Sequence, residues 1–390
     1  MKKKVLTIMG TRPEAIKLAP LINLLKERDE LESVLCLTAQ HREMLDQVLH
    51  LFELEPDYDL NIMAQNQSLT HITARALEGL EEVLLKEMPS LVLVQGDTTT
   101  TMAGAMASFY HKVPVGHVEA GLRSRDKYSP FPEEINRCIN SVISELHFAP
   151  TDSSKQNLLG EGIPESKLFV TGNTVIDALN TTVQDYFRFS DPFLREFNFD
   201  DYKVLLVEAH RRESFGFPLD EICEALLQIL NDFPQTFLLF PVHRNPEVRR
   251  AAYEYLGDHD RAKLLDPMDP LSFHNLMARS HIILTDSGGI QEEAPSLGKP
   301  VLVLRNVTER REAIEAGTAV LTGTSRERIY GEAARLLTDE AAYNEMARTG
   351  NPYGDGVASA RILDIILNFL GYRTTLPGPF IPKKVENKIL

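Results

Sequence analysis

The sequence has no tryptophan and only three cysteines in 390 residues. Cys36, Cys138 and Cys223 lie far apart and form no CxxC pair, which argues against a disulfide framework and predicts reduced thiols in a reducing compartment. No stretch approaches the roughly 18–20 apolar residues of a membrane span. The apolar run that follows the N-terminal lysines stops at Gly10, short of the roughly 7–15 residues that a signal peptide needs. The sequence therefore predicts a soluble cytoplasmic protein.

Several nucleotide, metal and nucleophile fingerprints are also missing. The chain has no GxGxxG dinucleotide motif and no Walker A motif, and its histidines show no HExxH or HxxEH spacing. It has no GxSxG nucleophile elbow either. These absences predict a protein that needs neither NAD nor a metal.

Acidic residues outnumber basic ones, and the formal net charge is −15. A large nucleic-acid or anionic-membrane surface is therefore excluded, because either partner would be repelled. A small anionic ligand held by a few arginines and backbone amides remains compatible with this charge.

What is present is an alternation of short apolar runs with amphipathic stretches. The 390 residues favour two domains, and alternation of this kind predicts an α/β fold of parallel sheets with helices on both faces. The expected strands cover residues 5–9, 33–37, 91–94, 114–118 and 146–149, then 168–170, 203–207, 236–240, 281–285 and 300–304. Helical patterns cover 15–26, 44–51, 69–86 and 219–230.

The domain boundary is expected just after the strand that ends at Val170. Residues 1–171 would then form the N-terminal domain and residues 172–356 the C-terminal domain. The helix near 357–371 could belong to either one. Residues 372–390 are expected to form an extended or mobile arm.

Nearly every unusual polar cluster directly follows an expected strand. In open parallel sheets ligands bind beyond the carboxyl ends of the strands, so these clusters should converge on one rim. They are Gly10-Thr11-Arg12 with Lys17, Gly96-Asp97 with Thr98 to Thr101, Glu119-Ala120-Gly121, Glu208-Ala209-His210 and Asp286-Ser287-Gly288-Gly289.

Two of these clusters are suited to phosphate. Gly288 and Gly289, between a strand and a helix, let backbone amides approach a pyrophosphate, and Glu292 or Glu293 could bind the ribose hydroxyls. The alternative is a helix capped by Ser287 with acidic first-turn residues. Arg12 and Lys17 open a helix whose N-terminus favours anions, although a plain surface turn fits that segment too.

Three carboxylates from separate strand ends are candidates for proton transfer. Asp97, Glu119 and Glu133, with His210 from the second half, are titratable groups of the kind that proton transfer at carbon needs. Glu133 could instead form a solvated ion pair with Arg137, four residues on. Asp97 could equally be a helix cap.

Ten segments in register resemble the non-hydrolysing UDP-N-acetylglucosamine 2-epimerases of bacteria. The resemblance runs from about residue 3 to about residue 370. Its segments are Gly10 to Lys17, Gln40-His41-Arg42, Gly96 to Thr100, His117 to Arg123, Pro132 to Arg137, Gly172-Asn173-Thr174, His210 to Glu213, Pro241-Val242-His243, Asp286 to Pro295 and Asn351 to Gly356.

The resemblance implies a GT-B architecture, in which two Rossmann-like domains face each other across a cleft and the last helix crosses back to the first domain. It implies interconversion of UDP-N-acetylglucosamine and UDP-N-acetylmannosamine, without a cofactor, by a homodimer that serves cell-surface polysaccharide synthesis. The implied chemistry is loss of UDP from C1 and of the C2 proton to give 2-acetamidoglucal, then re-addition of UDP with protonation on the opposite face.

The resemblance also implies roles for individual residues. The catalytic set would be Asp97, Glu119, Glu133 and His210, and the assignment of each carboxylate to a face of C2 stays open. Substrate would be held by Arg12, Lys17, Arg137, Phe273, Ser287, Gly288, Gly289, Glu293 and Arg310. A second, allosteric UDP-sugar would bind near Gln40, Glu43, Arg211 and His243, although these could simply be rim residues.

Three positions depart from the family pattern. Glu208-Ala209 stands where Thr-Gly is usual before His210, which puts an extra negative charge near the diphosphate. Arg311 replaces the usual proline, and Phe217 replaces a charged residue.

Other functions remain open at this point. They are epimerisation of a modified relative such as a 2,3-diacetamido UDP-sugar, hydrolysis to free N-acetylmannosamine, a GT-B glycosyltransferase, or a silent nucleotide-sugar-binding protein. The three carboxylates argue against the transferase, which has no need to move a C2 proton.

Overall fold

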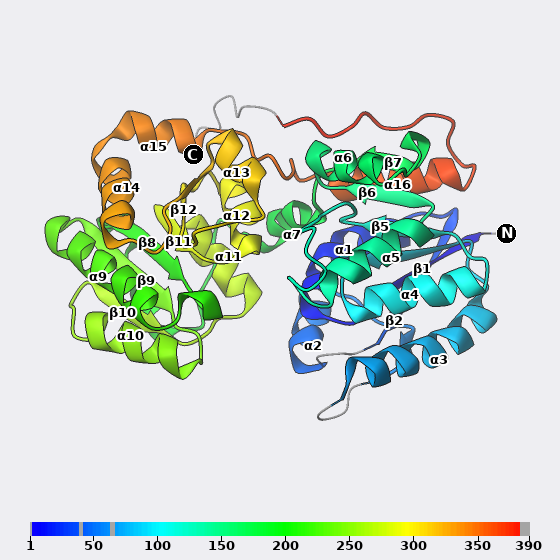
Figure 1. The fold of residues 1–390 in the computed structure, drawn as a ribbon, viewed down its shortest axis with the longest axis horizontal. Helices are drawn as coiled ribbons and strands as arrows, with labels where there is room; N and C mark the ends of the chain where they lie inside the picture. The colour runs from blue at the N-terminus through cyan, green and yellow to red at the C-terminus, as the bar shows by residue number, and fades with distance from the viewer. Residues whose placement is uncertain (1, 39–41, 63–66, 383–390) are drawn as a thin grey trace. The chain divides into compact units, whose positions relative to one another are not determined.

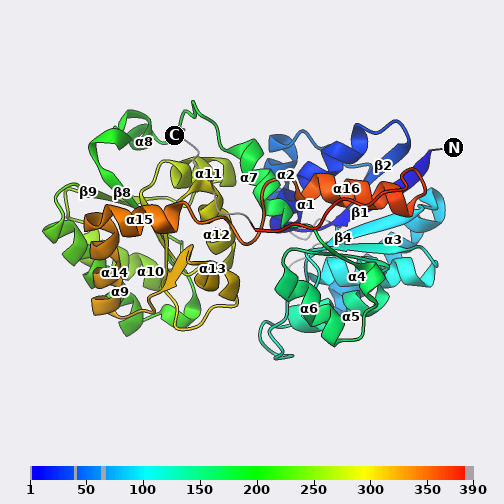
Figure 2. The ribbon, with the colours of Figure 1, turned by 90° about the horizontal axis from the view of Figure 1, so that it is seen from above.

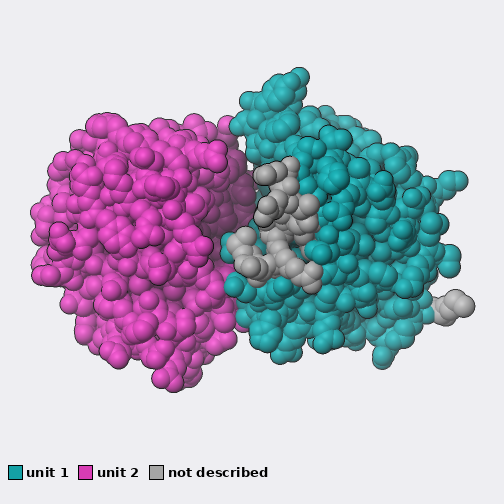
Figure 3. All heavy atoms as spheres, turned by 90° about the horizontal axis from the view of Figure 1, so that it is seen from below, with its two compact units in different colours: residues 1–178, 353–380 teal, residues 179–352, 381–390 magenta. Residues whose placement is uncertain are grey.

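The chain folds into two compact units, shown in different colours in Figure 3. A computed structural model describes residues 2–38, 42–62 and 67–382, and the side chains of 42–44 are not described. Unit 1 comprises Met1–Ala178 and Tyr353–Phe380, and unit 2 comprises Leu179–Pro352 and Ile381–Leu390. The change of unit thus comes at Ala178, seven residues after the expected boundary, because the helix that follows the last strand of unit 1 is shared between the units.

Unit 1 is built on a seven-stranded sheet whose neighbouring strands are all parallel. Its aliphatic strands are buried because helices cover both faces, which is why they read as continuous apolar runs. The order is β3 (Tyr58–Asp59), β2 (Leu31–Leu37), β1 (Lys3–Met9), β4 (Leu91–Gln95), β5 (Val115–Val118), β6 (Leu146–Ala149) and β7 (Leu168–Val170).

Helices pack on both faces of this sheet (Figure 1). One face carries α1 (Arg12–Lys26), α2 (Arg42–Leu51) and α16 (Ala358–Phe369), and the other carries α3 (Leu69–Glu87) and α4 (Thr99–Tyr110). The remaining helices of this part of the chain are α5 (Glu133–Ile143), α6 (Asp152–Gly160), η1 (Glu165–Lys167) and α7 (Thr174–Thr182).

The last helix returns to unit 1, as the predicted fold class requires. Leu18 and Ile22 of α1 share a core with Ile362 and Ile366 of α16, and Figure 2 shows α16 beside α1. The tail beyond it has no helix or strand as far as residue 382. Phe380 is buried and its amide donates to the Val170 carbonyl at 2.8 Å, so the tail is held on unit 1.

Unit 2 repeats the design with a six-stranded parallel sheet. Its strands, in order, are β10 (Ala262–Leu265), β9 (Thr236–Pro241), β8 (Lys203–Glu208), β11 (Ile282–Thr285), β12 (Val301–Val303) and β13 (Ala319–Leu321). One face is covered by α9 (Phe217–Asp232), α10 (Pro246–Leu256) and α14 (Arg326–Thr338). The other helices are α8 (Pro192–Glu196), η2 (Phe199–Asp201), η3 (Arg212–Ser214), α11 (Pro270–Ala278), α12 (Gly288–Glu293), η4 (Ala294–Leu297), α13 (Arg311–Ala316) and α15 (Glu340–Ala347).

The two parallel α/β sheets confirm the predicted fold class. All ten expected strands are present, whereas β3, β10 and β13 were not predicted. These three are edge strands of two to four residues, too short for a clear apolar pattern. Among the helices of the described residues, none is long and apolar enough to cross a membrane.

Candidate active site

The polar loops of unit 1 follow the adjacent strands β1, β4 and β5, so their side chains meet at the carboxyl edge of the sheet. Gly10, after β1, shows how tight the packing is. A Cβ there would lie 2.2 Å from Thr38 Oγ1 and 2.4 Å from Thr100 Oγ1, so only glycine fits. The first loop is therefore held directly against the start of α4.

Glu119 lies at the end of β5 and is held by several donors. Its backbone is in the left-handed region, with φ +65°, which costs a non-glycine residue on the order of 1 kcal/mol and is typical of functional sites. Lys17 Nζ lies 2.6 Å from Oε1, Asn173 Nδ2 donates to the same oxygen at 3.0 Å, and Gln95 Nε2 donates to Oε2. Lys17, predicted to bind the diphosphate, thus pairs with this carboxylate.

Asp97 follows β4 and pairs with Arg137. Arg137 Nε and Nη2 both donate to Asp97 Oδ2, at 2.8 and 2.5 Å. The helix cap of α4 is Thr98, whose side chain accepts from the Thr101 amide, so the alternative of Asp97 as the cap is wrong. Burial would lower the pKa of Arg137, but Asp97 and Glu134 outweigh it and raise that pKa, which keeps the guanidinium charged.

Glu133 and Glu134 open α5 and play different parts. Arg137 pairs with Asp97 and with Glu134, at 3.1 Å, so the alternative of a solvated Glu133–Arg137 pair is wrong. Glu133 Oε2 is buried and accepts no hydrogen bond from the residues that the structure describes. A buried acceptor without a donor is uncommon in folded proteins, so this oxygen is available to a ligand or a proton.

Glu134, which the sequence reasoning did not single out, is a structural anchor. It accepts hydrogen bonds from the amides of Ser124, at 3.0 Å, and Arg125, at 2.8 Å, as well as from Arg137. Burial would raise its pKa, but these donors outweigh burial and lower the pKa. Glu134 therefore fixes the loop after β5 beside Asp97.

The threonines near Asp97 serve a second buried carboxylate, Glu14. Its side chain accepts from the amides of Gly10 and Thr11 and from the hydroxyls of Thr11, Thr98 and Thr101, at 2.7–3.0 Å. Burial raises the pKa of Glu14, although these donors oppose it. The network joins the N-termini of α1 and α4, and so positions Arg12 at the start of α1.

In unit 2 the loop between β11 and α12 has the features of an anion site. Ser287 occupies the N-cap position, but its side chain makes no capping hydrogen bond, so the simple-cap alternative does not explain it. A Cβ on Gly288 would lie 3.2 Å from Glu309 Oε1 and 3.5 Å from Arg310 Cζ. The Arg310 guanidinium therefore lies against the backbone of this loop, where amides and a cation suit a phosphate.

The two glutamates of α12 are also distinct. Glu292 is 2% exposed and its Oε1 lies 2.5 Å from Arg310 Nε, so it orients that cation. Glu293 keeps a partly exposed carboxylate, 3.4 Å from His274 Nε2. Phe273, beside His274 on α11, is partly exposed. Of the two glutamates, Glu293 is the one whose carboxylate can accept hydrogen bonds from the hydroxyl groups of a ligand.

His210 follows β8 and contacts a carboxylate that the sequence reasoning had not linked to it. Its Nδ1 lies 2.6 Å from Glu208 Oε1 and 3.5 Å from Asp286 Oδ1. Asp286 Oδ2 accepts from the amides of His210 and Arg211, both at 2.8 Å, and so fixes the loop. The Glu208 contact raises the pKa of His210, although burial opposes this.

Glu208, His210 and Asp286 are also the residues that could gather around a metal, since one ligand atom from each lies within 4.8 Å of the others. The geometry does not fit this use. Two ligands of a tetrahedral zinc ion, with bonds of about 2.0–2.1 Å, are about 3.3 Å apart. Nδ1 and Oε1 are only 2.6 Å apart, a hydrogen-bond distance. The two groups are paired directly with each other.

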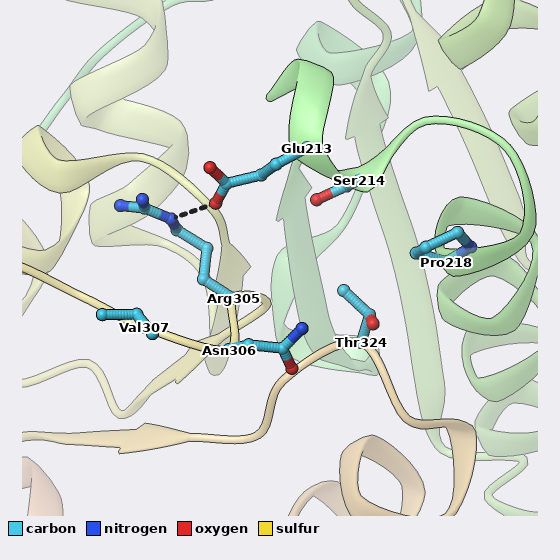
Figure 4. Close-up of a pocket in the computed structure, with 7 residues that line it drawn as sticks. All are labelled: Glu213, Ser214, Pro218, Arg305, Asn306, Val307 and Thr324. Atoms are coloured by element: carbon cyan, nitrogen blue, oxygen red, sulfur yellow. Dashed lines mark hydrogen bonds and ion pairs between the residues drawn. The ribbon is translucent and has the colours of Figure 1, made fainter. Parts of the chain in front are cut away.

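A pocket of about 200 Å³ lies in unit 2 (Figure 4). Its lining residues come from η3, the start of α9 and the segments after β12 and β13; they are Glu213, Ser214, Pro218, Arg305, Asn306, Val307 and Thr324. Arg305 pairs with Glu213 at 2.6 Å and with Glu309 at 2.8 Å, and Glu309 approaches Gly288. The pocket is therefore linked to the loop between β11 and α12, which contains Ser287 and is called the anion loop below. No sequence pattern indicated this pocket.

The residues predicted for a second ligand are only partly described. Gln40 lies outside the described residues, as does the side chain of Glu43. Arg211 has a buried Nε without a hydrogen-bond partner among described residues, and the His243 ring lies 5.5 Å from that of His210. Arg211 and His243 are thus neighbours of His210.

The other two unusual positions begin helices. Phe217 is the first residue of α9 and is 74% exposed. Arg311 is the first residue of α13. Proline is favoured at a first helical position but is not required there, so Arg311 is accommodated without distortion.

Comparisons with known proteins agree with one another. A family model described as UDP-N-acetylglucosamine 2-epimerase matches residues 23–367. A Bacillus subtilis protein named UDP-N-acetylglucosamine 2-epimerase is 54% identical over 384 residues, covering 98% of this chain and 100% of its own. A crystal structure from Listeria monocytogenes, 48% identical, covers 98% of this chain and 100% of its own with a TM-score of 0.93. A UDP-GlcNAc 2-epimerase from Neisseria meningitidis, solved bound to UDP-GlcNAc, is 49% identical, with a TM-score of 0.83 and coverage of 94% and 100%.

Proposed function

This chain belongs to the UDP-N-acetylglucosamine 2-epimerase family, and from that premise we propose that it interconverts UDP-N-acetylglucosamine and UDP-N-acetylmannosamine. The observation that carries the proposal is the set of three carboxylates at one sheet edge of unit 1. Asp97 and Glu119 are held by cations, and Glu133 keeps a buried oxygen to which no described residue donates. Such a set supports proton removal and return at a carbon atom.

The reaction begins with cleavage of the C1–O bond, whose electron pair leaves with UDP, and loss of the C2 proton. The product is 2-acetamidoglucal, to which UDP adds back at C1 while C2 is protonated on the opposite face. Positive charge that develops at C1 is stabilised by nearby carboxylates, and the departing UDP by cations and amide dipoles.

We assign proton removal on one face of C2 to Glu133. The oxygens of Glu119 accept from Lys17 and Gln95, and Oδ2 of Asp97 accepts from Arg137. Glu133 Oε2, in contrast, makes no hydrogen bond within the described chain. The Glu133 oxygen to which no described residue donates is therefore the one that we assign to receive the C2 proton.

The nucleotide is assigned to unit 2. The diphosphate would bind the backbone amides of Ser287, Gly288 and Gly289, with Arg310 beside them. Glu293 would accept hydrogen bonds from the ribose hydroxyls, and Phe273 would pack on the uracil. The support is the approach of Arg310 to Gly288 and the uncapped start of α12. Within unit 1, we assign Arg12, Lys17 and Arg137 to substrate binding.

Regulation by a second UDP-sugar forms part of the proposal. Arg211 and His243 lie beside His210, and the proposed bond cleavage does not use them. A ligand that binds these residues more tightly in one conformation of the protein would increase the population of that conformation. Pure UDP-N-acetylmannosamine should then turn over slowly until a trace of UDP-N-acetylglucosamine is added, and His243→Ala should weaken that activation. Immediate hyperbolic turnover of pure UDP-N-acetylmannosamine would exclude a second site.

The activity is tested by following the anomeric proton signals of UDP-N-acetylglucosamine by NMR. A new signal from UDP-N-acetylmannosamine, reaching the same ratio from either side, is expected. Accumulation of free N-acetylmannosamine would identify a hydrolysing enzyme instead. Turnover of a 2,3-diacetamido UDP-sugar alone would identify the modified substrate.

A further inference from the structure

Glu208 is held at both carboxylate oxygens. It ends β8 and pairs in register with Thr285 of β11. Its Oε2 accepts from Thr285 Oγ1 at 2.9 Å, and its Oε1 lies 2.6 Å from His210 Nδ1. The carboxylate therefore has a defined orientation and directs one oxygen at the imidazole.

We infer that Glu208 is a positioning residue that holds His210 as an imidazolium, with the Nδ1 side of the ring paired with Glu208 and the Nε2 side left for the substrate. The inference rests on the proposed function, in which His210 belongs to the catalytic set. It adds a residue to the proposed catalytic set of Asp97, Glu119, Glu133 and His210.

The groups around His210 explain the preference for the charged ring. Two carboxylates face it: Glu208 from β8, and Asp286 Oδ1, 3.5 Å away at the end of β11. Arg211, in the same loop, has the opposite effect on the pKa of His210. The ring of His243, which follows β9, stacks on the His210 ring with 5.5 Å between the ring centroids. The net effect is a raised pKa for His210, caused first by Glu208 and opposed by burial.

A threonine could not do the same. It has no negative charge and a shorter side chain, so Asp286, whose Oδ2 already accepts two backbone amides, would be the one carboxylate left near the ring. A carboxylate fixed beside Nδ1 also favours one orientation of the ring, as carboxylate partners of histidine do elsewhere. Asp286 lies in the anion loop, so an imidazolium here lies near the departing UDP.

The charge of His210 can be measured without any turnover. Ring signals of isotope-labelled histidine are titrated by NMR in the wild type, and His210 is identified by the signal that is lost in His210→Gln. The pKa of His210 should fall in Glu208→Gln and in Glu208→Thr. It should stay unchanged in Glu254→Gln, which removes the same charge from an exposed position on α10 of the same unit. Circular dichroism checks that each variant is folded, and an unchanged or raised pKa in folded Glu208→Gln would overturn the inference.

The consequence for catalysis is read from the pH profile of kcat. In both Glu208 variants the alkaline limb should move to lower pH, so that kcat falls about ten-fold on the alkaline side of the profile and less than about two-fold on its acid side. A lowered pKa of His210 with an unmoved alkaline limb would show that the charge of His210 is not used. If the wild type does not act on UDP-N-acetylglucosamine at all, the proposed function fails, while the NMR titration still decides whether Glu208 holds the imidazolium.

Discussion

Lys17 Nζ lies 2.6 Å from Glu119 Oε1, and this pair joins the first helix of the chain to the end of the fifth strand. The side chains are 19% and 6% exposed. A carboxylate so little exposed needs a cation to remain charged, and removing one partner of a buried pair leaves an uncompensated charge. The pair therefore explains how Glu119 can act as an anion beside a sugar.

Lys17→Met should damage both stability and rate. Loss of the ammonium should cost about 1–3 kcal/mol of unfolding free energy and about 10²-fold in kcat. The matched control is Lys155→Met, which breaks a pair with Glu165, a partner that is 73% exposed, and should change stability by less than about 0.5 kcal/mol. Urea unfolding measures the loss of stability, and steady-state kinetics measure the loss of kcat. If Lys17→Met and Lys155→Met have the same stability and the same kcat, the role assigned to the Lys17–Glu119 pair is wrong.

Asp97→Asn, Glu119→Gln and Glu133→Gln should each lower kcat by about 10²–10⁴-fold, as expected for general acid–base groups. Kinetic assays on variants shown to be folded provide the measurement. Any one of the three with a nearly wild-type kcat would lose its proposed role.

The neighbours Glu133 and Glu134 should separate catalysis from stability. Among the residues that the structure describes, none donates to Glu133 Oε2, so Glu133→Gln should lower activity with little change in the unfolding free energy. Glu134→Gln disturbs contacts to Ser124, Arg125 and Arg137 and should cost about 1–3 kcal/mol. Equal losses of unfolding free energy in the two variants would contradict the conclusion that Glu133 Oε2 makes no stabilising hydrogen bond with the described residues.

Gly288→Ala should raise the KM for UDP-N-acetylglucosamine. The added methyl group would meet Glu309 at 3.2 Å and Arg310 at 3.5 Å, where the diphosphate is proposed to bind. An increase of about ten-fold or more is expected, since each lost factor of ten corresponds to about 1.4 kcal/mol. Gly331→Ala is the control, because a Cβ there meets nothing within 4 Å. Identical KM values in both variants would place the nucleotide elsewhere.

Activity should persist after exhaustive chelation and without added NAD. The expectation rests on the missing fingerprints and on the direct 2.6 Å contact of Glu208 and His210, which is too short for two ligands of one ion. Assays of chelator-treated, desalted protein measure it. Loss of activity that a divalent ion restores would contradict this part of the account.

Stability should fall in mild acid because of two buried histidines that face each other across β5 and β6. Burial lowers the pKa of His117 to about 4 and that of His147 to about 3. The unfolded chain takes up these protons near pH 6.5 and the folded chain does not, so stability is lost as the pH falls from about 6.5 towards 4.

Replacement of one of these histidines tests that linkage. His147→Leu should retain about 1–2 kcal/mol more of its neutral-pH stability than the wild type does near pH 5. His71→Leu, at an exposed position of α3, should leave the acid dependence unchanged. Thermal unfolding across pH 5–7.5 gives the comparison, and parallel curves for the wild type and His147→Leu would contradict it.

The regular part of the fold was predictable because its strands are fully buried aliphatic runs. β1, β4 and β8 were found within two residues of their ends, whereas β3, β10 and β13 were missed. An edge strand of two to four residues is specified by its neighbour in space more than by its own pattern. The boundary was placed early because α7 continues past the last strand of unit 1 to Thr182.

The sequence predicted which segments contribute residues to the candidate site, but it predicted few of the contacts between their side chains. Strand ends located Asp97, Glu119 and His210, since parallel strands bring their carboxyl ends to one edge. The sequence could not tell that Arg137 selects Glu134 over Glu133, because both lie within one helical turn of it. It identified Glu208 as unusual, but the contact with His210 depends on side-chain orientations that spacing does not determine.

The central claim is that a proton leaves C2 and returns from solvent-exchangeable groups while UDP departs and returns. The most direct test is incubation with UDP-N-acetylglucosamine in deuterated water, followed by NMR at C2 and mass spectrometry. The account predicts one deuterium at C2 of both UDP-N-acetylmannosamine and recovered UDP-N-acetylglucosamine, and incorporation that is about 10²–10⁴-fold slower with Glu133→Gln. Epimerisation that retains the original proton at C2 would contradict it.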